Sequence, residues 1–379
     1  MRPPGAGPGR PTPVYLDHAA ASPVRPEVAA AMADVLTTVG NPSSPHGPGR
    51  HVRALLEGAR RTIGERMGVT AERVVFTSGG TEANALALLG FAGPRLVTVV
   101  EHASVLENAP DGPRIPVDAE GVIDLAALAD LLARVRPGLV SVMLANNETG
   151  VLQPVREVAR LAHAAGALLH CDAAQAFGKL PCDPAGLGAD LVSLSAHKLG
   201  GPPGIGALVL APAVQPEALL RGGGQEGRRR AGTPNLPGIV GFAAAAGLMT
   251  DCQAMAAERD RLERLARACR PEVEIAGGTA ARLPNIACLV TPGLAGDLQM
   301  MALDLAGIAV GVGAACSSGR IGPSHVLAAM GLPADHAGAA IRVSLGWSSL
   351  PADVDCFVAA WSALPAPRAS RDTTVATIS

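Results

Sequence analysis

Aromatic side chains are scarce in this chain of 379 residues, which has five Phe, two Trp and one Tyr. A planar ligand would therefore have to stack largely on histidine, of which there are nine. Paired cysteines are missing as well, because none of the seven cysteines forms a CxxC motif. We predict no metal site, and we interpret most cysteines as small core residues kept reduced in a cytoplasmic setting.

Strong net charge and long apolar runs are also absent. The formal net charge is −2 at pH 7, which argues against nucleic acid or an anionic membrane as a direct partner. The longest apolar stretch, residues 239–249, contains two glycines and is too short to span a bilayer. Residues 1–13 contain eight Pro or Gly and no apolar signal-peptide core, so we expect a disordered leader.

Apolar strands alternate with helical patterns over the first two thirds of the chain. A helix is predicted at 25–36, followed by a Gly/Pro-rich loop at 40–50. Predicted strands follow at 74–77, 95–100, 139–144, 167–171 and 189–194, with helices at 81–89, 124–135 and 155–165. Asp124 is the expected N-cap of the second of these helices. Continuous apolar strands between helices are typical of a parallel sheet covered on both faces, an α/β fold.

The pattern changes near residue 252. A long helix is predicted at 251–269, and shorter strands (286–290, 341–345) then alternate with helices (296–305, 351–363). We predict a large domain over residues 14–252, a smaller C-terminal α/β domain over 253–365, and a flexible tail at 366–379.

Polar residues follow the predicted strands, where parallel α/β sheets bind their ligands. A small-residue turn that opens a helix, as at Gly80 and Thr81, suits a phosphate. A carboxylate directly after a buried strand, as at Asp172, needs a cationic partner. Lys198 by itself fits either a surface lysine or an amine nucleophile that carries pyridoxal phosphate. The remaining polar residues at these strand ends are His102, Asn147, Gln175, Ser195 and His197.

In this order the motifs resemble the cysteine desulfurases of group I, the NifS/IscS kind, in the class V aminotransferase family. The resemblance runs from about Tyr15 to Trp347 and includes FTSGGTEANALAL, NNETGVLQP, SLSAHKLGGPPGIGAL, GGGQEGRRRAGT and ACSSG. It implies the fold-type I architecture of pyridoxal-phosphate enzymes, with a mostly parallel seven-stranded sheet. It also implies removal of sulfur from L-cysteine, which gives L-alanine and a persulfide on Cys316.

The resemblance also implies a role for each residue around the cofactor ring. Lys198 would hold pyridoxal 5'-phosphate covalently and move protons at the substrate α-carbon. Asp172 would keep the pyridine nitrogen protonated, and Gln175 would bond the ring hydroxyl. His102 would stack on the ring and assist proton transfer.

Further roles concern the phosphate and the substrate. By the same resemblance, Asn147 and Arg342 would hold the substrate carboxylate, which suits a planar guanidinium. Thr233 would reach the phosphate from a second subunit, which implies a homodimer. The phosphate ligands of the same subunit would be Gly80, Thr81, Ser195 and His197.

Cys316 lies in a stretch, residues 311–319, that has almost no side-chain bulk. Such a segment suits a nucleophile that must travel better than a structural cysteine. Eight positions separate Cys316 from Ser324, a spacing that resembles the long-loop group, in which the persulfide reaches a sulfur-acceptor protein.

Some positions depart from the family pattern, namely Gln225, Trp347 and His18, and they leave the finer shape of the site open. A selenocysteine lyase or another class V enzyme is the nearest alternative, and a catalytically silent sulfur-relay protein is a second. The destination of the sulfur also stays open between iron–sulfur clusters, tRNA or DNA thiolation and a small-molecule pathway. A nicotinamide-dependent dehydrogenase is rejected, because the first βα turn reads SGGTEAN and not GxGxxG.

Overall fold

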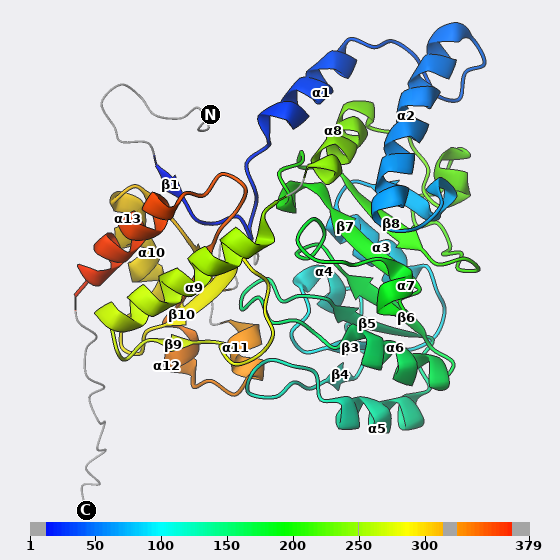
Figure 1. The fold of residues 1–379 in the computed structure, drawn as a ribbon. Coiled ribbons are helices and arrows are strands. Elements are labelled where there is room, and N and C mark those ends of the chain that lie inside the picture. The colour runs from blue at the N-terminus through cyan, green and yellow to red at the C-terminus, as the bar shows by residue number, and fades with distance from the viewer. Residues whose placement is uncertain (1–12, 249, 314–323, 366–379) are drawn as a thin grey trace, which may run out of the picture.

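The structure is a computed structural model that describes residues 13–248, 250–313 and 324–365 (Figure 1). Cys316, the predicted tail and residues 1–12 of the predicted leader lie outside these described residues. The described elements form a large sheet covered by helices and a smaller group around a second sheet (Figure 1).

The large sheet has seven strands in the spatial order β2-β8-β7-β6-β5-β3-β4. Among them β8 alone runs antiparallel to its neighbours, so the carboxyl ends of the others share one edge. This confirms the predicted mostly parallel, seven-stranded sheet. The strands are β2 (Val74–Thr77), β3 (Arg95–Thr98), β4 (Arg114–Ile115), β5 (Leu139–Met143), β6 (Leu168–Asp172), β7 (Leu191–Ser195) and β8 (Gly206–Leu210).

Both faces of this sheet are buried under helices. Side chains alternate between the faces along each strand, so Val74 and Phe76 enter one apolar cluster and Val75 enters another. On the first face lie α1 (Pro26–Leu36), α2 (Gly47–Arg66), α5 (Leu125–Val135), α6 (Val155–Ala164), α7 (Pro184–Leu187) and α8 (Leu236–Gly247). On the second face lie α3 (Gly80–Leu89) and α4 (Ala103–Leu106).

Most element boundaries agree with the sequence patterns within two residues, and Asp124 caps α5 by accepting the N–H groups of Ala126 and Ala127. The prediction of a loop over 40–50 is wrong at its end, because α2 begins at Gly47. The His46 side chain caps α2, and a proline in the first turn removes only an N–H that would have had no partner. Neither β8 nor α8 was predicted.

The smaller group surrounds a four-stranded antiparallel sheet in the order β12-β13-β10-β9. Its core includes Leu262, Val343 and Trp361. Its elements are β9 (Glu274–Ile275), β10 (Ile286–Val290), β11 (Ile308–Ala309), β12 (Gly311–Val312), β13 (Ala340–Ser344), α9 (Cys252–Cys269), α10 (Gly296–Leu305), α11 (His325–Ala329), α12 (Ala334–Ala337) and α13 (Pro351–Ser362).

The first strand lies with this later group. β1 (Val14–Tyr15) pairs with β11, and Leu16 enters the core of the smaller group. The chain then crosses to α1 on the large sheet (Figure 1), so residues 17–25 run between the two groups. The division near residue 252 and the two domain ranges stay predictions.

Within the described residues, no single helix is long and apolar enough to cross a membrane. The pair α8 and α9 meets the length and composition only when both are taken together across a sharp bend. Most apolar residues of α8, including Ile239 and Phe242, are buried against the large sheet and its neighbouring helices.

Candidate active site

A cavity of about 490 Å³ lies at the carboxyl edge of the large sheet. Its size is within the range of small-molecule sites. Ten predicted residues line it: Gly80, Thr81, His102, Asn147, Asp172, Gln175, Ser195, His197, Lys198 and Arg342. Thr233 lies outside this cavity and lines two smaller cavities nearby, and Cys316 is outside the described residues.

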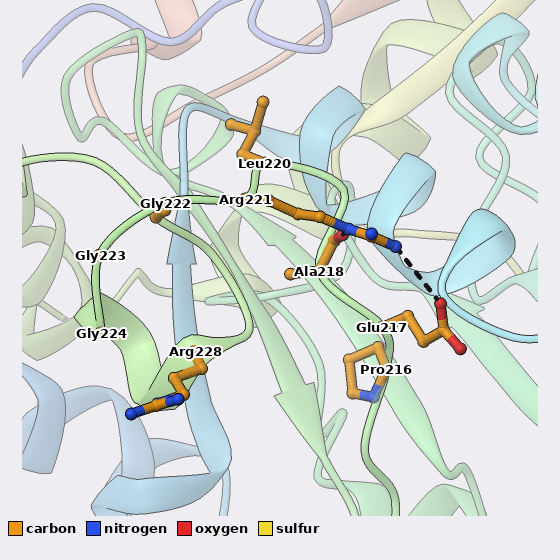
Figure 2. A pocket seen from close by; sticks show the side chains of 10 residues that line it. Pro216, Glu217, Ala218, Leu220, Arg221, Gly222, Gly223, Gly224 and Arg228 are labelled. Atoms are coloured by element: carbon orange, nitrogen blue, oxygen red, sulfur yellow. Dashed lines mark hydrogen bonds and ion pairs between the residues drawn. The ribbon is translucent and has the colours of Figure 1, made fainter.

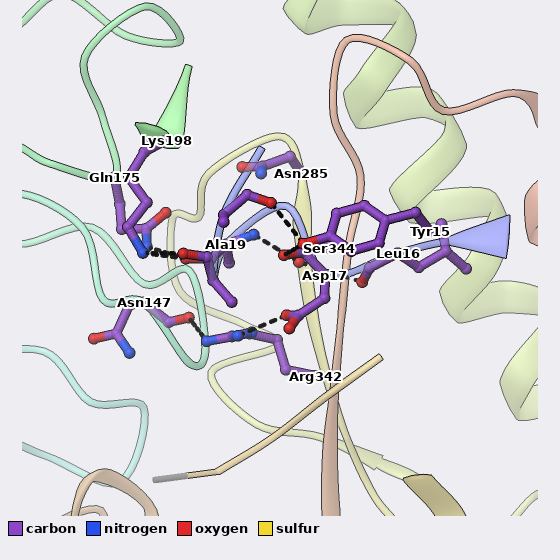
Figure 3. A network of polar contacts seen from close by, with 12 residues as sticks. Tyr15, Leu16, Asp17, Ala19, Asn147, Gln175, Lys198, Asn285, Arg342 and Ser344 are labelled. Atoms are coloured by element: carbon purple, nitrogen blue, oxygen red, sulfur yellow. Dashed lines mark hydrogen bonds and ion pairs between the residues drawn. The ribbon is translucent and has the colours of Figure 1, made fainter. Parts of the chain in front are cut away.

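Lys198 ends a short 3₁₀ turn, η2 (Ala196–Lys198), that directly follows β7. Its Nζ donates to the carbonyl oxygens of Ala19 at 2.6 Å and Ala20 at 2.8 Å. The amide Nε2 of Gln175 also donates to the Ala19 oxygen, at 2.8 Å, and Figure 3 shows the two side chains converging there. The amine is therefore held inside the cavity, and Lys198 is not a surface lysine.

Asp172 is the last residue of β6 and is 7 % exposed. One carboxylate oxygen, Oδ1, accepts the N–H of Ala174 at 2.9 Å, and Oδ2 accepts Nδ2 of Asn84 at 2.7 Å. Asn84 on α3 was not predicted as a site residue. A buried amide on a helix whose other buried residues are apolar was the signal that could have revealed it.

His102 caps α4, and its Nδ1 accepts the backbone N–H of Ser104 at 3.1 Å. The other imidazole of the cavity, His197, has its Nδ1 2.8–2.9 Å class hydrogen bonding with Ser195, at 2.9 Å to Oγ. Burial lowers the pKa of His197 to about 4, and the nearby Lys198 and His102 lower it further. His197 is therefore a neutral ring at physiological pH.

The first turn of α3 opens towards the cavity. Its N-cap, Gly79, provides no side-chain cap, and its φ of 147° favours glycine. A side chain at Gly206 of β8 would place Cβ 2.6 Å from the carbonyl carbon of Gly79, so only glycine lets β8 approach this turn. Helix N–H groups with Ser195 and His197 beside them suit a phosphate.

Arg342 reaches the cavity from β13 of the smaller group. Its Nη1 donates to the Asn147 carbonyl oxygen at 2.9 Å, and its Nη2 pairs with Oδ1 of Asp17 at 2.7 Å (Figure 3). The Nε atom is buried and has no hydrogen-bond partner within the described part of the chain. Asp17, another residue that sequence reasoning missed, thus orients a guanidinium that suits a carboxylate ligand.

The residues of this cavity fit pyridoxal phosphate. Asp172 offers an ionisable acceptor for a ring N–H, and Lys198 offers the amine. The Oε1 atom of Gln175 is buried without a partner within the described residues, as expected of an acceptor that awaits a ligand hydroxyl.

A second cavity, of about 530 Å³, lies in the loop between β8 and α8 (Figure 2). It is lined by Gly222, Gly223 and Gly224 and by Arg221, which pairs with Glu217 at 3.8 Å. Both partners are more than 80 % exposed, and Arg228 points away from them (Figure 2). Solvated charges of this kind bind weakly, so this cavity is not the candidate active site.

Residues 14–357 match the family described as aminotransferase class-V. A protein of Cereibacter sphaeroides named cysteine desulfurase is 44% identical over 360 residues, which cover 90% of this chain and 93% of that protein. The solved structure of a NifS-like protein from Rickettsia africae superposes with a TM-score of 0.85 at 33% identity, covering 92% of this chain and 98% of that one. The structure titled "SspA in complex with cysteine" has a TM-score of 0.78 at 28% identity, with 89% and 99% covered. The chain belongs to the aminotransferase class-V family.

Proposed function

We propose that this chain is a cysteine desulfurase that takes sulfur from L-cysteine, releases L-alanine and carries the sulfur as a persulfide on Cys316. Enzymes of the family depend on pyridoxal phosphate, so the predicted cofactor is confirmed. The observation that carries the proposal is that the Lys198 amine, the Asp172 carboxylate and the Arg342 guanidinium line one cavity. Among the comparison proteins, two bear names or titles that mention cysteine chemistry or bound cysteine.

When bound, the cofactor supplies a protonated pyridine ring that withdraws electrons from the substrate α-carbon. In our proposal Asp172 faces the ring nitrogen, and Gln175 bonds the ring hydroxyl. Lys198 holds the cofactor and later moves the α-proton. His102 lies against the ring.

Other residues of the cavity would hold the phosphate and the substrate. We assign the phosphate to Gly80, Thr81, Ser195 and His197, where a helix N-terminus meets hydroxyl and ring donors. Arg342 and Asn147 would bind the substrate carboxylate, which fixes the direction in which its sulfur points.

Sulfur transfer needs the thiolate of Cys316. That thiolate attacks the substrate sulfur and forms an S–S bond, while the carbon–sulfur bond breaks and its electron pair stays on carbon. Addition of protons to the carbon side completes L-alanine, and an acceptor protein then removes the outer sulfur. Residues flanking the 314–323 segment support this: Ser324 Oγ donates to Glu148 Oε2 at 2.5 Å, and Gly313 also lies against Glu148, next to Asn147 of the cavity.

The test compares Lys198→Ala and Cys316→Ser with the parent enzyme. We expect Lys198→Ala to lose the absorbance of covalently held cofactor after gel filtration and to lose turnover. Cys316→Ser should keep that absorbance, because the substitution leaves the cavity intact, but should form no ³⁵S-labelled persulfide from labelled cysteine. Sulfide release by Cys316→Ser at the parent rate would contradict the proposal.

Cys269→Ser is the matched control, because Cys269 is also a free thiol and is exposed. It should leave alanine production and persulfide labelling unchanged. Rates with selenocysteine, measured beside those with cysteine, separate this function from that of a selenocysteine lyase.

A further inference from the structure

A continuous hydrogen-bond chain runs behind the cavity and joins Asp172 to His102. Nδ2 of Asn84 lies 2.7 Å from Oδ2 of Asp172 and 2.8 Å from Oγ of Ser104. The Ser104 Oγ in turn lies 2.8 Å from Nδ1 of His102. Four side chains from β6, α3, α4 and the N-cap of α4 are thus connected without a gap.

The donors and acceptors in this chain have a defined direction. An ionised carboxylate only accepts, so the amide nitrogen of Asn84 must face Asp172. The second hydrogen of that nitrogen points to Ser104, whose oxygen accepts it. The one hydroxyl hydrogen of Ser104 is then left to donate to Nδ1 of His102.

The backbone points the same way. The N–H of Ser104 also donates to Nδ1 of His102, at 3.1 Å, and a backbone N–H cannot act as an acceptor. Two donors therefore meet the same ring nitrogen. Nδ1 carries the lone pair, and the single ring hydrogen of the neutral imidazole lies on Nε2.

Burial makes this arrangement costly to rearrange. Asn84 is 1 % exposed and Ser104 is 8 % exposed. The Oδ1 atom of Asn84 is buried with no hydrogen-bond partner within the described residues. The amide thus keeps an unpaired acceptor while both of its donors are used, so the donor side sets its orientation.

We propose that Asn84 and Ser104 are positioning residues that hold His102 neutral, with its hydrogen on Nε2, at the cofactor ring. This inference rests on the proposed function. A neutral imidazole can lie against a protonated pyridine ring without charge repulsion, which an imidazolium cannot. In this state Nε2 donates a hydrogen bond and accepts no proton, so proton removal at the substrate α-carbon falls to Lys198 alone.

The test reads the ring hydrogens of His102 directly, by ¹⁵N–¹H NMR correlation of histidine-labelled protein with and without pyridoxal phosphate. The His102 signal is assigned by its loss in His102→Gln. We expect an unprotonated Nδ1 and a protonated Nε2 in both samples. A protonated Nδ1 in the parent protein would overturn the proposal, whatever the desulfurase activity proves to be.

Ser104→Ala removes the hydroxyl donor and keeps the backbone donor. We expect the ratio of the two neutral ring forms of His102 to fall by about fivefold, the factor that one hydrogen bond of ordinary strength contributes. Its two ring ¹⁵N shifts then move towards each other. Shifts identical to those of the parent would show that the chain does not act on His102.

Ser141→Ala is the matched control. Ser141 Oγ lies 2.8 Å from Nδ1 of His170, another buried histidine on the same sheet. This change should alter the His170 signal and leave that of His102 unchanged. A His102 signal that moves equally in both variants would indicate a general structural effect and would also overturn the proposal.

Asn84→Asp is the sharpest variant, because its shape is conserved and its donors are lost. The new carboxyl group shares a proton with Asp172, since two adjacent carboxylates do not both ionise. Its other oxygen then accepts the hydroxyl of Ser104, which turns away from His102. We expect the hydrogen of His102 to shift towards Nδ1 and kcat for alanine production to fall more than KM changes; a parent-like ring pattern would contradict the direction we assign.

Discussion

Glu101, a carboxyl group beside the cavity, is fully buried. Its Oε1 accepts the hydroxyl of Thr98 at 2.6 Å and the N–H of Met143 at 2.8 Å, while Oε2 has no partner within the described residues. Burial raises the pKa of Glu101 to about 8, and the nearby Asp172 raises it further, against the two hydrogen bonds. The neutral acid is therefore the form that the folded protein prefers at physiological pH.

This raised pKa predicts how the free energy of unfolding depends on pH. Between the model value of 4.5 and about 8 the folded state keeps a proton that the unfolded state has released. The stabilisation is complete below pH 4.5 and is lost as the pH rises through 8, by on the order of a few kcal/mol. Glu101→Gln should abolish that loss, so urea unfolding at pH 5 to 9 should show a flatter profile than the parent. Glu217→Gln, at a residue whose side chain is 84% exposed, should follow the parent profile; a parent-like slope in Glu101→Gln would contradict the assignment.

At the scale of secondary-structure elements, one buried ion pair closes the edge of the large sheet. Arg60 of α2 binds Glu226 through two nitrogens, at 2.6 and 2.7 Å. Glu226 lies in η3 (Gln225–Arg228) with a φ of 48°. Its Oε2 accepts the N–H of Phe76, and Arg60 donates to the Val74 carbonyl oxygen. Since β2 is an edge strand, the pair satisfies backbone groups that a further strand would have bonded.

Breaking this pair on one side should be more costly than removing it. Arg60→Met and Glu226→Gln should each lower the free energy of unfolding by about 3 kcal/mol, because a buried charge or its backbone partners stay unpaired. The double variant should cost clearly less than the sum of the two, as measured by urea unfolding. The exposed pair Arg221 and Glu217 is the control, and its variants should change stability by less than about 0.5 kcal/mol. Strict additivity at Arg60 and Glu226 would show that the two side chains do not act as a pair.

At the scale of the whole molecule, the cavity depends on both groups of elements. The strand ends supply Asp172 and Lys198, while Arg342 comes from β13 and Ala19 from the segment that crosses between the groups. Thr233 lines neighbouring cavities and not this one, which agrees with a role in the site of a second subunit.

A mixed-dimer experiment tests that role. Lys198→Ala and Thr233→Ala chains are co-expressed with different tags, and mixed dimers are purified. If Thr233 acts across the interface, each mixed dimer has one intact site and one doubly altered site, so activity should reach about half that of the parent dimer. If Thr233 acts within its own chain, mixed dimers should show no gain over the average of the two single-variant dimers.

The amino-acid sequence by itself determined the architecture and most of the cavity. Apolar strands alternate with helices at a spacing that permits only a mostly parallel sheet, and the ends of such strands must meet at one edge. Polar residues at those ends, from Gly80 to Lys198, therefore had to come together whatever the details of packing. Arg342 and Cys316 needed the resemblance to known desulfurases, because no local pattern links them to strand ends 140 residues away or more.

Only the tertiary structure decided which atoms meet. Asp17 and Arg342 are 325 positions apart, and Asn84 and Asp172 are 88 apart, yet each pair makes a hydrogen bond of 2.7 Å. Such contacts depend on how helices pack on a sheet to within about 1 Å, which hydrophobic periodicity does not specify. The direction of the chain from Asp172 to His102, and the neutral ring that it implies, follow from those distances alone.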